Sequence, residues 1–524
     1  MSVSEIKTYP PNQGSDKNQA RGTSLVFVIF WSLVFTLAYS QAPLFTSNQN
    51  QYFLHGLSEA GLGHLSEDWL AKTVDPTPAF SALISLTYRM IPWEPIFYIY
   101  YGFLAGIYLF SLLGIVDYLY DTGKTTITRW SFLTLITLLH SAAVRYLINN
   151  IFGLNWNYLL DGGVAGQRLL GEVLQPSTFG VLLLLSIHLF LRGKYWWAIV
   201  PLALAVSMHP TYLLGAAVLT LIYMGSIYWQ EKNLWRSIKL GAATLLAVTP
   251  ILIHTIQVYR STGAWATERA RDILVNFRIP HHALPTIWFN EASVVKILFI
   301  FIALYLLRKK QLFYLVLIPL VVGVALTIAQ IFTGSNVLAL LFPWRISTFL
   351  IPIAISVITA WGVSRVYPMI ARLPEHLLVM SMIIITLGAS GAGIAKFSLA
   401  YLEKESSNDQ AMMDYVNTHK SEGDVYLIPL DLQNFRLETG APVYIDFKSI
   451  PYRDGDILEW YHRVSQAGKV YRASRKIVGC TALDEIKAEG VTHVVLPYDH
   501  TVKNCALLER KYIDTNYEVF LINP

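Results

Sequence analysis

The residues of this chain that could do chemistry stand in a few short polar segments between long apolar stretches. Carboxylates can take a proton from a hydroxyl group, and guanidinium and imidazole groups can hold a phosphate. The carboxylate candidates are Glu67, Asp68 and Asp75, and the candidates for binding substrate are Asp161, Gln167, Arg168, His209, Arg278, His281, His282 and Arg345. Together these residue types could form a reaction or binding centre.

The three acids lie in the first polar segment, residues 46–95. A carboxylate in a partly dry cleft becomes a stronger base, because desolvation disfavours its charged form. The more common use of such acids is structural. Glu67 or Asp68 would cap or solvate a surface helix, and Asp75 would make a turn before Pro76. The sequence leaves both roles open.

The second polar segment, residues 161–168, is rich in glycine and ends on Arg168. Glycines permit close backbone approach, and the planar fork of Arg168 matches a phosphate, with Asp161 or Glu172 to orient it. Glycines also occur at membrane-surface turns for purely geometric reasons, and the spacing of a Walker phosphate loop is absent. The segment therefore indicates phosphate contact without defining a known motif.

The third polar segment, residues 259–292, contains Arg278-Ile279-Pro280-His281-His282. The two histidines and Arg278 could bind a phosphate or a divalent metal ion. The alternative is an interfacial belt, with Trp265 and Trp288 at headgroup depth. His209 and Arg345, at helix ends on the same side, would complete a basic pocket edged by aromatic rings.

Composition defines the elements that must position these residues. Of 524 residues, 54% are hydrophobic and only 14% are charged, and the mean hydropathy is +0.43. Such a chain is an integral membrane protein, and its spans should be helices because backbone polar groups in lipid must be satisfied within the segment.

We predict an α-helical polytopic bundle over residues 24–396, with about eleven spans of roughly 20 residues each. The spans are expected near residues 24–45, 94–118, 130–147, 178–192, 195–208, 211–229, 237–258, 293–307, 312–333, 346–363 and 376–396. The fourth and fifth are short, so they could instead form a re-entrant pair, which would leave the sidedness of later segments unchanged.

Lysine and arginine predict the orientation. They concentrate in alternate short connections, from the predicted cytoplasmic tail 1–23, with Lys7, Lys17 and Arg21, to the connection with Arg365 and Arg372. Short basic connections face the cytoplasm, so the polar segments should lie outside a cell (inner) membrane. The net charge of +5 follows from this topology, and we expect no nucleic-acid partner.

Residues 397–524 are more charged and predict a small extracytoplasmic α/β domain. Strands are expected at 425–429, 443–447, 493–497 and 518–522, and helices at 456–467 and 482–489. Cys480 and Cys505 are the only cysteines. They would form a disulfide in an oxidising compartment, or else be two unrelated buried residues.

The layout of the whole chain resembles the polyprenyl-phosphate-sugar-dependent glycosyltransferases of the C-type fold. The shared features are an N-terminus-inside bundle, acids in the first outer segment, the His209-Pro210 turn and an external terminal domain. More narrowly, several motifs look similar to a set of bacterial cell-envelope membrane proteins of unassigned function. These motifs are Ala165-Gly166-Gln167-Arg168 with Gln175-Pro176-Ser177, Arg278 with Pro280-His281-His282, Pro343-Trp344-Arg345, and Val443-Tyr444-Ile445-Asp446-Phe447-Lys448.

The resemblance implies inverting transfer of a sugar from a lipid-linked phosphate donor to an acceptor hydroxyl, with a first-segment acid as base. Asp68 or Glu67 best matches that acid, with Asp75 in reserve, although here the acids follow the first helix by a longer interval than is usual in the family. Basic groups, or a divalent metal ion, would stabilise the departing phosphate. Arg436, Lys448 or Tyr452 of the outer domain would help to select the acceptor.

Two other classes of function remain open. A transporter or lipid flippase would work near the middle of the membrane, often with inverted repeats. The chain has no convincing internal repeat, and its polar residues gather at the outer rim. The third class is a non-catalytic partner in the assembly of a cell-surface polymer.

Overall fold

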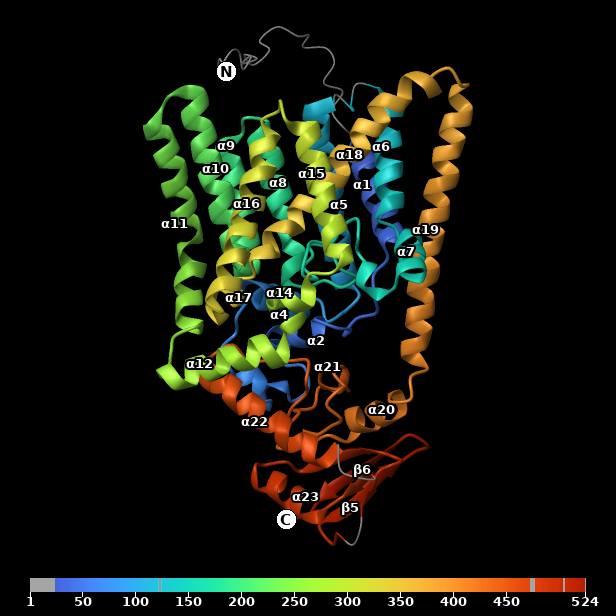
Figure 1. The fold of residues 1–524 in the computed structure, drawn as a ribbon. Coiled ribbons are helices and arrows are strands. Elements are labelled where there is room, and N and C mark those ends of the chain that lie inside the picture. The colour runs from blue at the N-terminus through green and yellow to red at the C-terminus, as the bar shows by residue number, and fades with distance from the viewer. Residues whose placement is uncertain (1–23, 121, 124, 472–475, 503–504, 524) are drawn as a thin grey trace.

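The computed structural model describes residues 24–120, 122–123, 125–471, 476–502 and 505–523. A bundle of helices makes up most of the chain, and a small α/β domain lies beyond one end of it (Figure 1). The predicted tail 1–23, with Lys7, Lys17 and Arg21, lies outside the described residues. The chain therefore has the two-part organisation of a helical membrane bundle with a strand-containing C-terminal region.

Helices occupy all the regions where spans were predicted. They are α1 (Leu25–Tyr39), α5 (Ile96–Tyr120), α6 (Thr126–Leu139) with α7 (Ala142–Phe152), α8 (Val181–Leu191), α9 (Tyr195–Met208), α10 (Leu213–Glu231), α11 (Leu234–Val258), α15 (Glu291–Leu307), α16 (Leu312–Thr333), α18 (Ser347–Ile370) and α19 (Glu375–Glu405). Six helical stretches of the described chain are long and apolar enough to cross a membrane, and α6 with α7, bent by 45°, makes a seventh. Eleven crossings are not confirmed.

The short helices explain the difference in number. Helix α8 has 11 residues, and at about 1.5 Å per residue it falls well short of the roughly 30 Å hydrocarbon core. The tight turn through Gly193, whose φ is +71°, joins it to α9. Ser186 of α8 donates to the carbonyl of Ala198 in α9 at 2.8 Å. The two helices thus form a close hairpin, as expected for either two crossings or a re-entrant pair.

Basic turns and the α/β domain lie at opposite ends of the bundle. Arg192 and Lys194 bound the α8–α9 turn, Lys232 ends α10, and Arg308 ends α15. These turns and the α18–α19 connection lie at the end away from the α/β domain (Figure 1). The molecule therefore has one basic end and one end that carries the polar segments.

Short elements cover that polar end. They are α2 (Gln49–Tyr52), α3 (Leu54–Ala60), η1 (Leu65–Glu67), η2 (Leu70–Lys72), α4 (Pro78–Met90), η3 (Leu154–Trp156), η4 (Pro176–Gly180), η5 (Pro210–Tyr212), α12 (Ala264–Asp272), the π-helix η6 (Ile273–Arg278), α13 (Pro280–Ala283), α14 (Pro285–Trp288), α17 (Asn336–Leu340) and η7 (Pro343–Ile346). Prolines begin several of them, because a proline at the first helical position loses no hydrogen bond.

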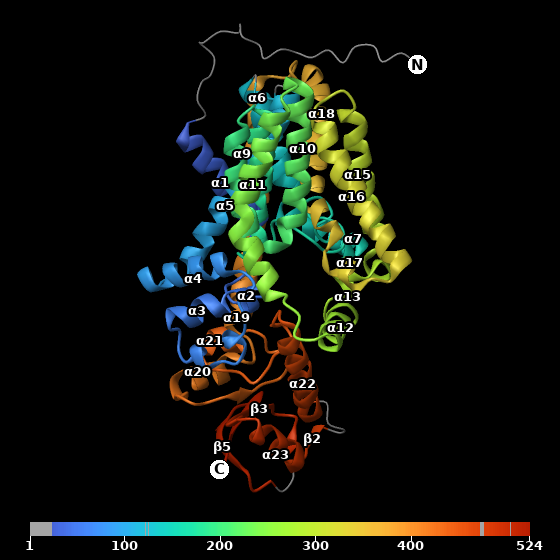
Figure 2. The same ribbon diagram turned by 90° about the vertical axis from the view of Figure 1, so that its left-hand side faces the viewer.

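The α/β domain contains a four-stranded sheet in the order β1-β3-β6-β5, with β1 parallel to β3 and the other pairs antiparallel (Figure 2). The strands and helices are α20 (Gln410–His419), β1 (Tyr426–Leu427), α21 (Phe435–Thr439), α22 (Asp454–Tyr471), β2 (Ile477–Val478), α23 (Cys480–Ala488), β3 (His493–Pro497), β4 (Thr501–Val502), β5 (Leu508–Ile513) and β6 (Tyr517–Ile522). Cys480 and Cys505 form a disulfide, which resolves the alternative left open by the sequence.

Several features of this domain differ from the sequence prediction, which also did not include α20, α21, β2 or β4. The strand expected at 443–447 is wrong, because the segment makes only an isolated parallel bridge, Tyr426 to Val443. The backbone N–H of Val443 donates to a side chain, Asp68, instead of a neighbouring strand. Strand β5 was not predicted, because its sequence, LERKYI, is mostly exposed and has little apolar alternation.

The α/β domain packs directly on the outer segments of the bundle. Gly63 and Gly440 both have positive φ, and His64 N–H donates to the Gly440 carbonyl at 2.8 Å. A Cβ at either glycine would meet the other's backbone. On the other side, Ala270 and Ile273 share one hydrophobic core with Trp460 of α22. These contacts fix the domain against the bundle.

We predict that thiol labelling will place the basic turns and the α/β domain on opposite sides of the membrane. The described residues contain no free cysteine, so the parent protein should give no signal. Lys309→Cys in the α15–α16 turn and Lys469→Cys on α22 should each react with an impermeant maleimide from only one side, and from different sides. Labelling of both from the same side would contradict the arrangement.

Candidate functional site

A cavity of about 1000 Å³ lies where the polar end of the bundle meets the α/β domain. Its wall is built from all three outer segments, from the bundle ends beside His209 and Arg345, and from Lys448 to Ile457 of the α/β domain. A volume of this size is at the upper end of those of small-molecule sites. Segments far apart in the sequence therefore line one cavity.

The structure brings seven of the eight predicted binding residues to this wall. They are Gln167, Arg168, His209, Arg278, His281, His282 and Arg345. The eighth, Asp161, is buried just behind the wall, where its carboxylate accepts a hydrogen bond from the Tyr39 hydroxyl at 2.7 Å. Their role in binding stays a prediction, but their convergence is a property of the fold.

Arg345 is held at the bundle side of the cavity by neutral acceptors. Its guanidinium donates to the Thr211 hydroxyl at 3.1 Å, to the Gln167 side-chain oxygen, and to His209 Nε2 at 2.5 Å. Burial and Arg345 lower the pKa of His209 well below its usual value, so this imidazole is neutral. These acceptors orient the guanidinium without cancelling its charge.

A second group of cations lies toward the α/β domain. Arg278 donates to the backbone carbonyl of Lys448 at 2.6 Å, and the guanidinium of Arg168 lies 4.1 Å from the centre of the Tyr158 ring. Burial, then Arg278 and Arg168, lower the pKa of Lys448 to about 8. The lowered pKa shows that Lys448 already lies in the field of the two arginines.

His281 and His282 lie between these groups, with ring centres 4.1 Å apart. His282 Nδ1 bonds to the carbonyl of Ala165 at 2.7 Å, and burial, with His281, Arg345 and Arg168, lowers its pKa to about 3. Burial, Arg278 and Lys448 lower the pKa of His281 as well. Both rings are therefore neutral at neutral pH and able to accept a hydrogen bond.

The positive charge of the cavity is not balanced by carboxylates. The cations on its wall are Arg168, Arg271, Arg278, Lys296, Arg345 and Lys448. Among the described residues none of them forms a salt bridge, and Asp454 is the one described carboxylate on the wall. Asp454 is occupied by Thr262, Thr267 and Gly455. The arrangement is suited to an anion.

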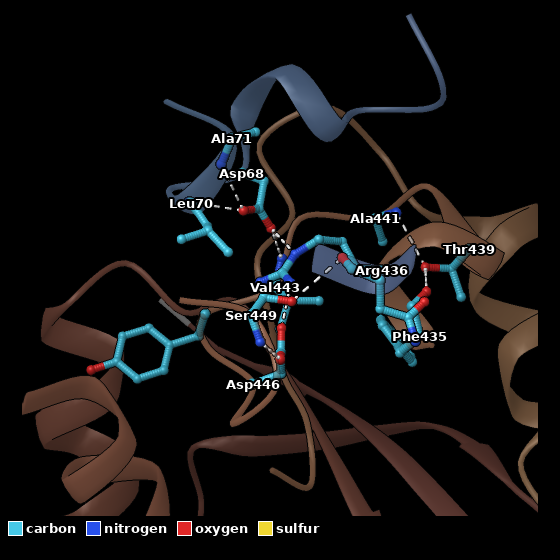
Figure 3. A network of polar contacts seen from close by, with 12 residues as sticks. Asp68, Leu70, Ala71, Phe435, Arg436, Thr439, Ala441, Val443, Asp446 and Ser449 are labelled. Carbon is cyan, nitrogen blue, oxygen red and sulfur yellow. Dashed lines mark hydrogen bonds and ion pairs between the residues drawn. The ribbon is translucent and has the colours of Figure 1, made fainter. Parts of the chain in front are cut away.

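The acids of the first polar segment do not lie on the cavity wall, and Asp68 belongs to a separate network of polar contacts (Figure 3). It is fully buried, with one carboxylate oxygen accepting from the N–H groups of Leu70 and Ala71 and the other from Arg436 Nε at 2.7 Å and from Val443 N–H. Arg436 also pairs with the buried Asp446. The geometry therefore gives Asp68 a structural role and offers no route from it to the cavity.

The same geometry corrects the expectation for Arg436. Its side chain is only 2% exposed, so it does not face an acceptor. Glu67 accepts from the N–H of Gly423 at 2.8 Å, and Asp75 accepts from the N–H of Thr77 at 2.8 Å as a turn residue. Neither acid lies on the cavity wall, so the geometry favours the structural alternatives for all three.

No group of three or more potential metal ligands occurs among the residues that the structure describes. A histidine pair surrounded by arginines and a lysine is also electrostatically unsuited to a cation. The sequence reasoning missed Lys296, which donates to the Gly163 carbonyl at 2.9 Å at the cavity wall. A lone lysine inside an apolar helix was the available signal.

Comparison with known proteins adds one short match. Residues 407–467 match a family model described as Domain of unknown function (DUF6798). The matched stretch holds Arg436, Asp446 and Lys448, and so covers both the buried ion cluster and the part of the α/β domain that reaches the cavity. No curated protein matches the chain.

We expect anion binding to weaken as the pH rises, because Lys448 loses its charge above its lowered pKa of about 8. A dialkyl phosphate keeps one negative charge throughout this range and is the proper probe. Its affinity should fall several-fold between pH 7 and about 9.5 in the parent protein. Lys448→Arg, which stays charged, should show a smaller pH dependence than the parent protein, in which Lys448 titrates. Equal pH dependence in both proteins would exclude Lys448 as the titrating group.

We predict that Arg436→Leu lowers the free energy of unfolding by about 3–5 kcal/mol, because it leaves Asp68 and Asp446 buried without a counter-charge. Thermal unfolding in detergent measures the change. The matched control is Arg510→Leu, which breaks an ion pair whose arginine is 53% exposed and should cost less than about 1 kcal/mol. Equal losses would mean that the buried cluster contributes no more than a surface pair.

Proposed function

We propose that this chain is a membrane glycosyltransferase that takes a sugar from a polyprenyl-linked phosphate donor and passes it to an acceptor hydroxyl outside the cell (inner) membrane. The observation that carries the proposal is the cavity with six cationic side chains, none of them in a salt bridge with a described carboxylate. Such a site favours a negatively charged ligand, and guanidinium groups match phosphate oxygens in pairs.

The cavity also suits a ligand with an apolar tail. Part of its wall consists of Leu213 and Leu214 at the start of α10, Val258 at the end of α11, Leu340 at the end of α17, and Leu341 directly after it. Leu341 is 45% exposed on the surface of the bundle. A polyprenyl chain could lie along these residues while its phosphate reaches the cations.

In the proposed reaction the acceptor oxygen attacks the anomeric carbon of the sugar. The bond from that carbon to the phosphate oxygen breaks, and the phosphate keeps the electron pair. Arg345, Arg278 and Lys448 stabilise the charge that develops on the phosphate. We assign proton removal from the acceptor to His281, which is neutral, lies on the wall and makes no side-chain hydrogen bond in the described chain. The acids of the first segment are not needed.

The disulfide supports the proposed location of the α/β domain. Disulfides persist in oxidising compartments outside the cytoplasm, and Cys480 and Cys505 are paired. The basic turns at the other end of the bundle would then face the cytoplasm. The acceptor would reach the cavity from the side of the α/β domain, where Tyr452 lies on the wall.

A lipid flippase is the second candidate, and one observation favours it. The only described carboxylate on the wall, Asp454, accepts four hydrogen bonds and is poorly placed to act as a base. A protein that binds the lipid phosphate and moves it, with no transfer, needs the cations but no base.

The test of the transferase is turnover by the purified protein in lipid, given labelled polyprenyl-linked sugars and an extract of candidate acceptors. His281→Gln should lower the transfer rate by about 10²–10⁴-fold and leave donor binding unchanged. Arg345→Lys should weaken donor binding by roughly tenfold, because lysine cannot reproduce the planar fork. His462→Gln, at a half-exposed histidine outside the cavity, is the matched control and should behave as the parent.

Each result separates the candidates. If His281→Gln transfers sugar at the parent rate, its assignment as base is wrong. Donor that binds and crosses proteoliposomes without any new glycosidic bond identifies the flippase. If the donor binds but is neither transferred nor moved across the membrane, the protein is a non-catalytic partner in polymer assembly. If the donor does not bind, the proposal of a lipid-phosphate site is wrong.

A further inference from the structure

The cavity has two separate cationic groups, and each presents an unused buried donor. Arg345 with His209 forms the bundle-side group, and Arg278 with Lys448 and Arg168 forms the domain-side group. His209 Nδ1 and Arg278 Nε are buried without a hydrogen-bond partner. Buried donors normally have partners, and leaving one unpaired costs about 1–3 kcal/mol. Both residues line the cavity, so each cationic group contains one donor without a partner.

The contact with Arg345 determines which nitrogen of His209 carries the proton. The guanidinium of Arg345 can only donate, so His209 Nε2, 2.5 Å away, must be the acceptor. The neutral ring then carries its proton on Nδ1, the atom without a partner. His209 lies on the cavity wall and is only 5% exposed, so this N–H is left without a partner within the protein.

The two groups are adjacent. Gln167 accepts from Arg345 in the bundle-side group, and the next residue, Arg168, acts on Lys448 in the domain-side group. Consecutive Cα atoms are about 3.8 Å apart. After burial and His281, Arg345 and Arg168 both lower the pKa of His282, and all three residues line the same cavity. The two groups therefore share one wall and are joined through consecutive residues, which suits one ligand with two linked phosphoryl groups.

The net charge of the cavity wall also favours two phosphoryl groups over one. A phosphodiester carries one negative charge and a diphosphate diester carries two, whereas the described residues of the wall include six cations and one carboxylate that is already occupied. The field of these cations contributes to keeping His209, His281 and His282 neutral. A single negative charge would compensate only one of the two groups and leave the other desolvated.

We infer that the donor is a polyprenyl diphosphate lipid, with one phosphoryl group against Arg345 and His209 and the other against Arg278, Lys448 and Arg168. This inference rests on the proposed function and specifies the linkage in its substrate. The sugar would be attached to the phosphoryl group nearer the acceptor, and the leaving group would be the polyprenyl diphosphate.

The experiment compares the binding of two lipids of the same chain length, a polyprenyl diphosphate and a polyprenyl monophosphate, to the purified full-length protein in detergent. We expect the diphosphate to bind at least tenfold more tightly. In Lys448→Gln this ratio should fall to below about threefold. Lys469→Gln, the same substitution at an exposed lysine of α22, should keep the parent ratio.

The outcomes distinguish this inference from the proposed function. If both lipids bind the parent protein equally tightly, the diphosphate inference is wrong and the lipid-phosphate site stands. If neither lipid binds, the proposed function is wrong, and so is the inference that rests on it. Thermal unfolding shows whether the Lys448→Gln protein is folded. If it is not folded, the comparison of the two lipids on the parent protein alone tests the inference.

Discussion

The ion pairs made by the buried guanidinium of Arg436 are the interactions on which the polar end of the molecule depends. The guanidinium joins Asp68 of the first outer segment to Asp446 of the α/β domain, and all three side chains are almost wholly out of water. Backbone N–H groups complete the coordination of both carboxylates. Because any slip would leave a charge buried and unpaired, the cluster holds the domain in one position. Lys448, two residues beyond Asp446, is thereby held at the cavity wall.

In the cavity, by contrast, the described cations are not paired with carboxylates. Arg278, Lys296 and Arg345 are oriented by carbonyls, a hydroxyl, an amide and an imidazole, which accept their hydrogen bonds without neutralising them. In a partly dry space such charges interact strongly, because little water screens them. The site is therefore prepared for an anion before one arrives, and it is assembled from both the bundle and the domain. An anionic ligand would in turn strengthen the contact between them.

Several features were predictable from particular residues. Apolar stretches located the helices of the bundle, and Arg192, Lys232 and Arg308 indicated which turns share an end. The convergence of Arg168, Arg278, His281 and Arg345 followed from that sidedness. The structural role of Asp68 was not predictable, because its partners Arg436 and Val443 are more than 350 residues away in sequence. Neither local propensity nor spacing specifies such a pairing.

The sequence by itself determined that this is a helical membrane protein with its ionisable outer segments gathered at one end, because hydrophobicity and the positions of lysine and arginine act locally along the chain. Tertiary structure alone decided which charges are paired. Whether a carboxylate serves as a buried structural partner, as Asp68 does, or a cation remains available, as Lys448 does, depends on desolvation and on neighbours brought from distant segments. Those are properties of the packed molecule, and they determine where its chemistry can take place.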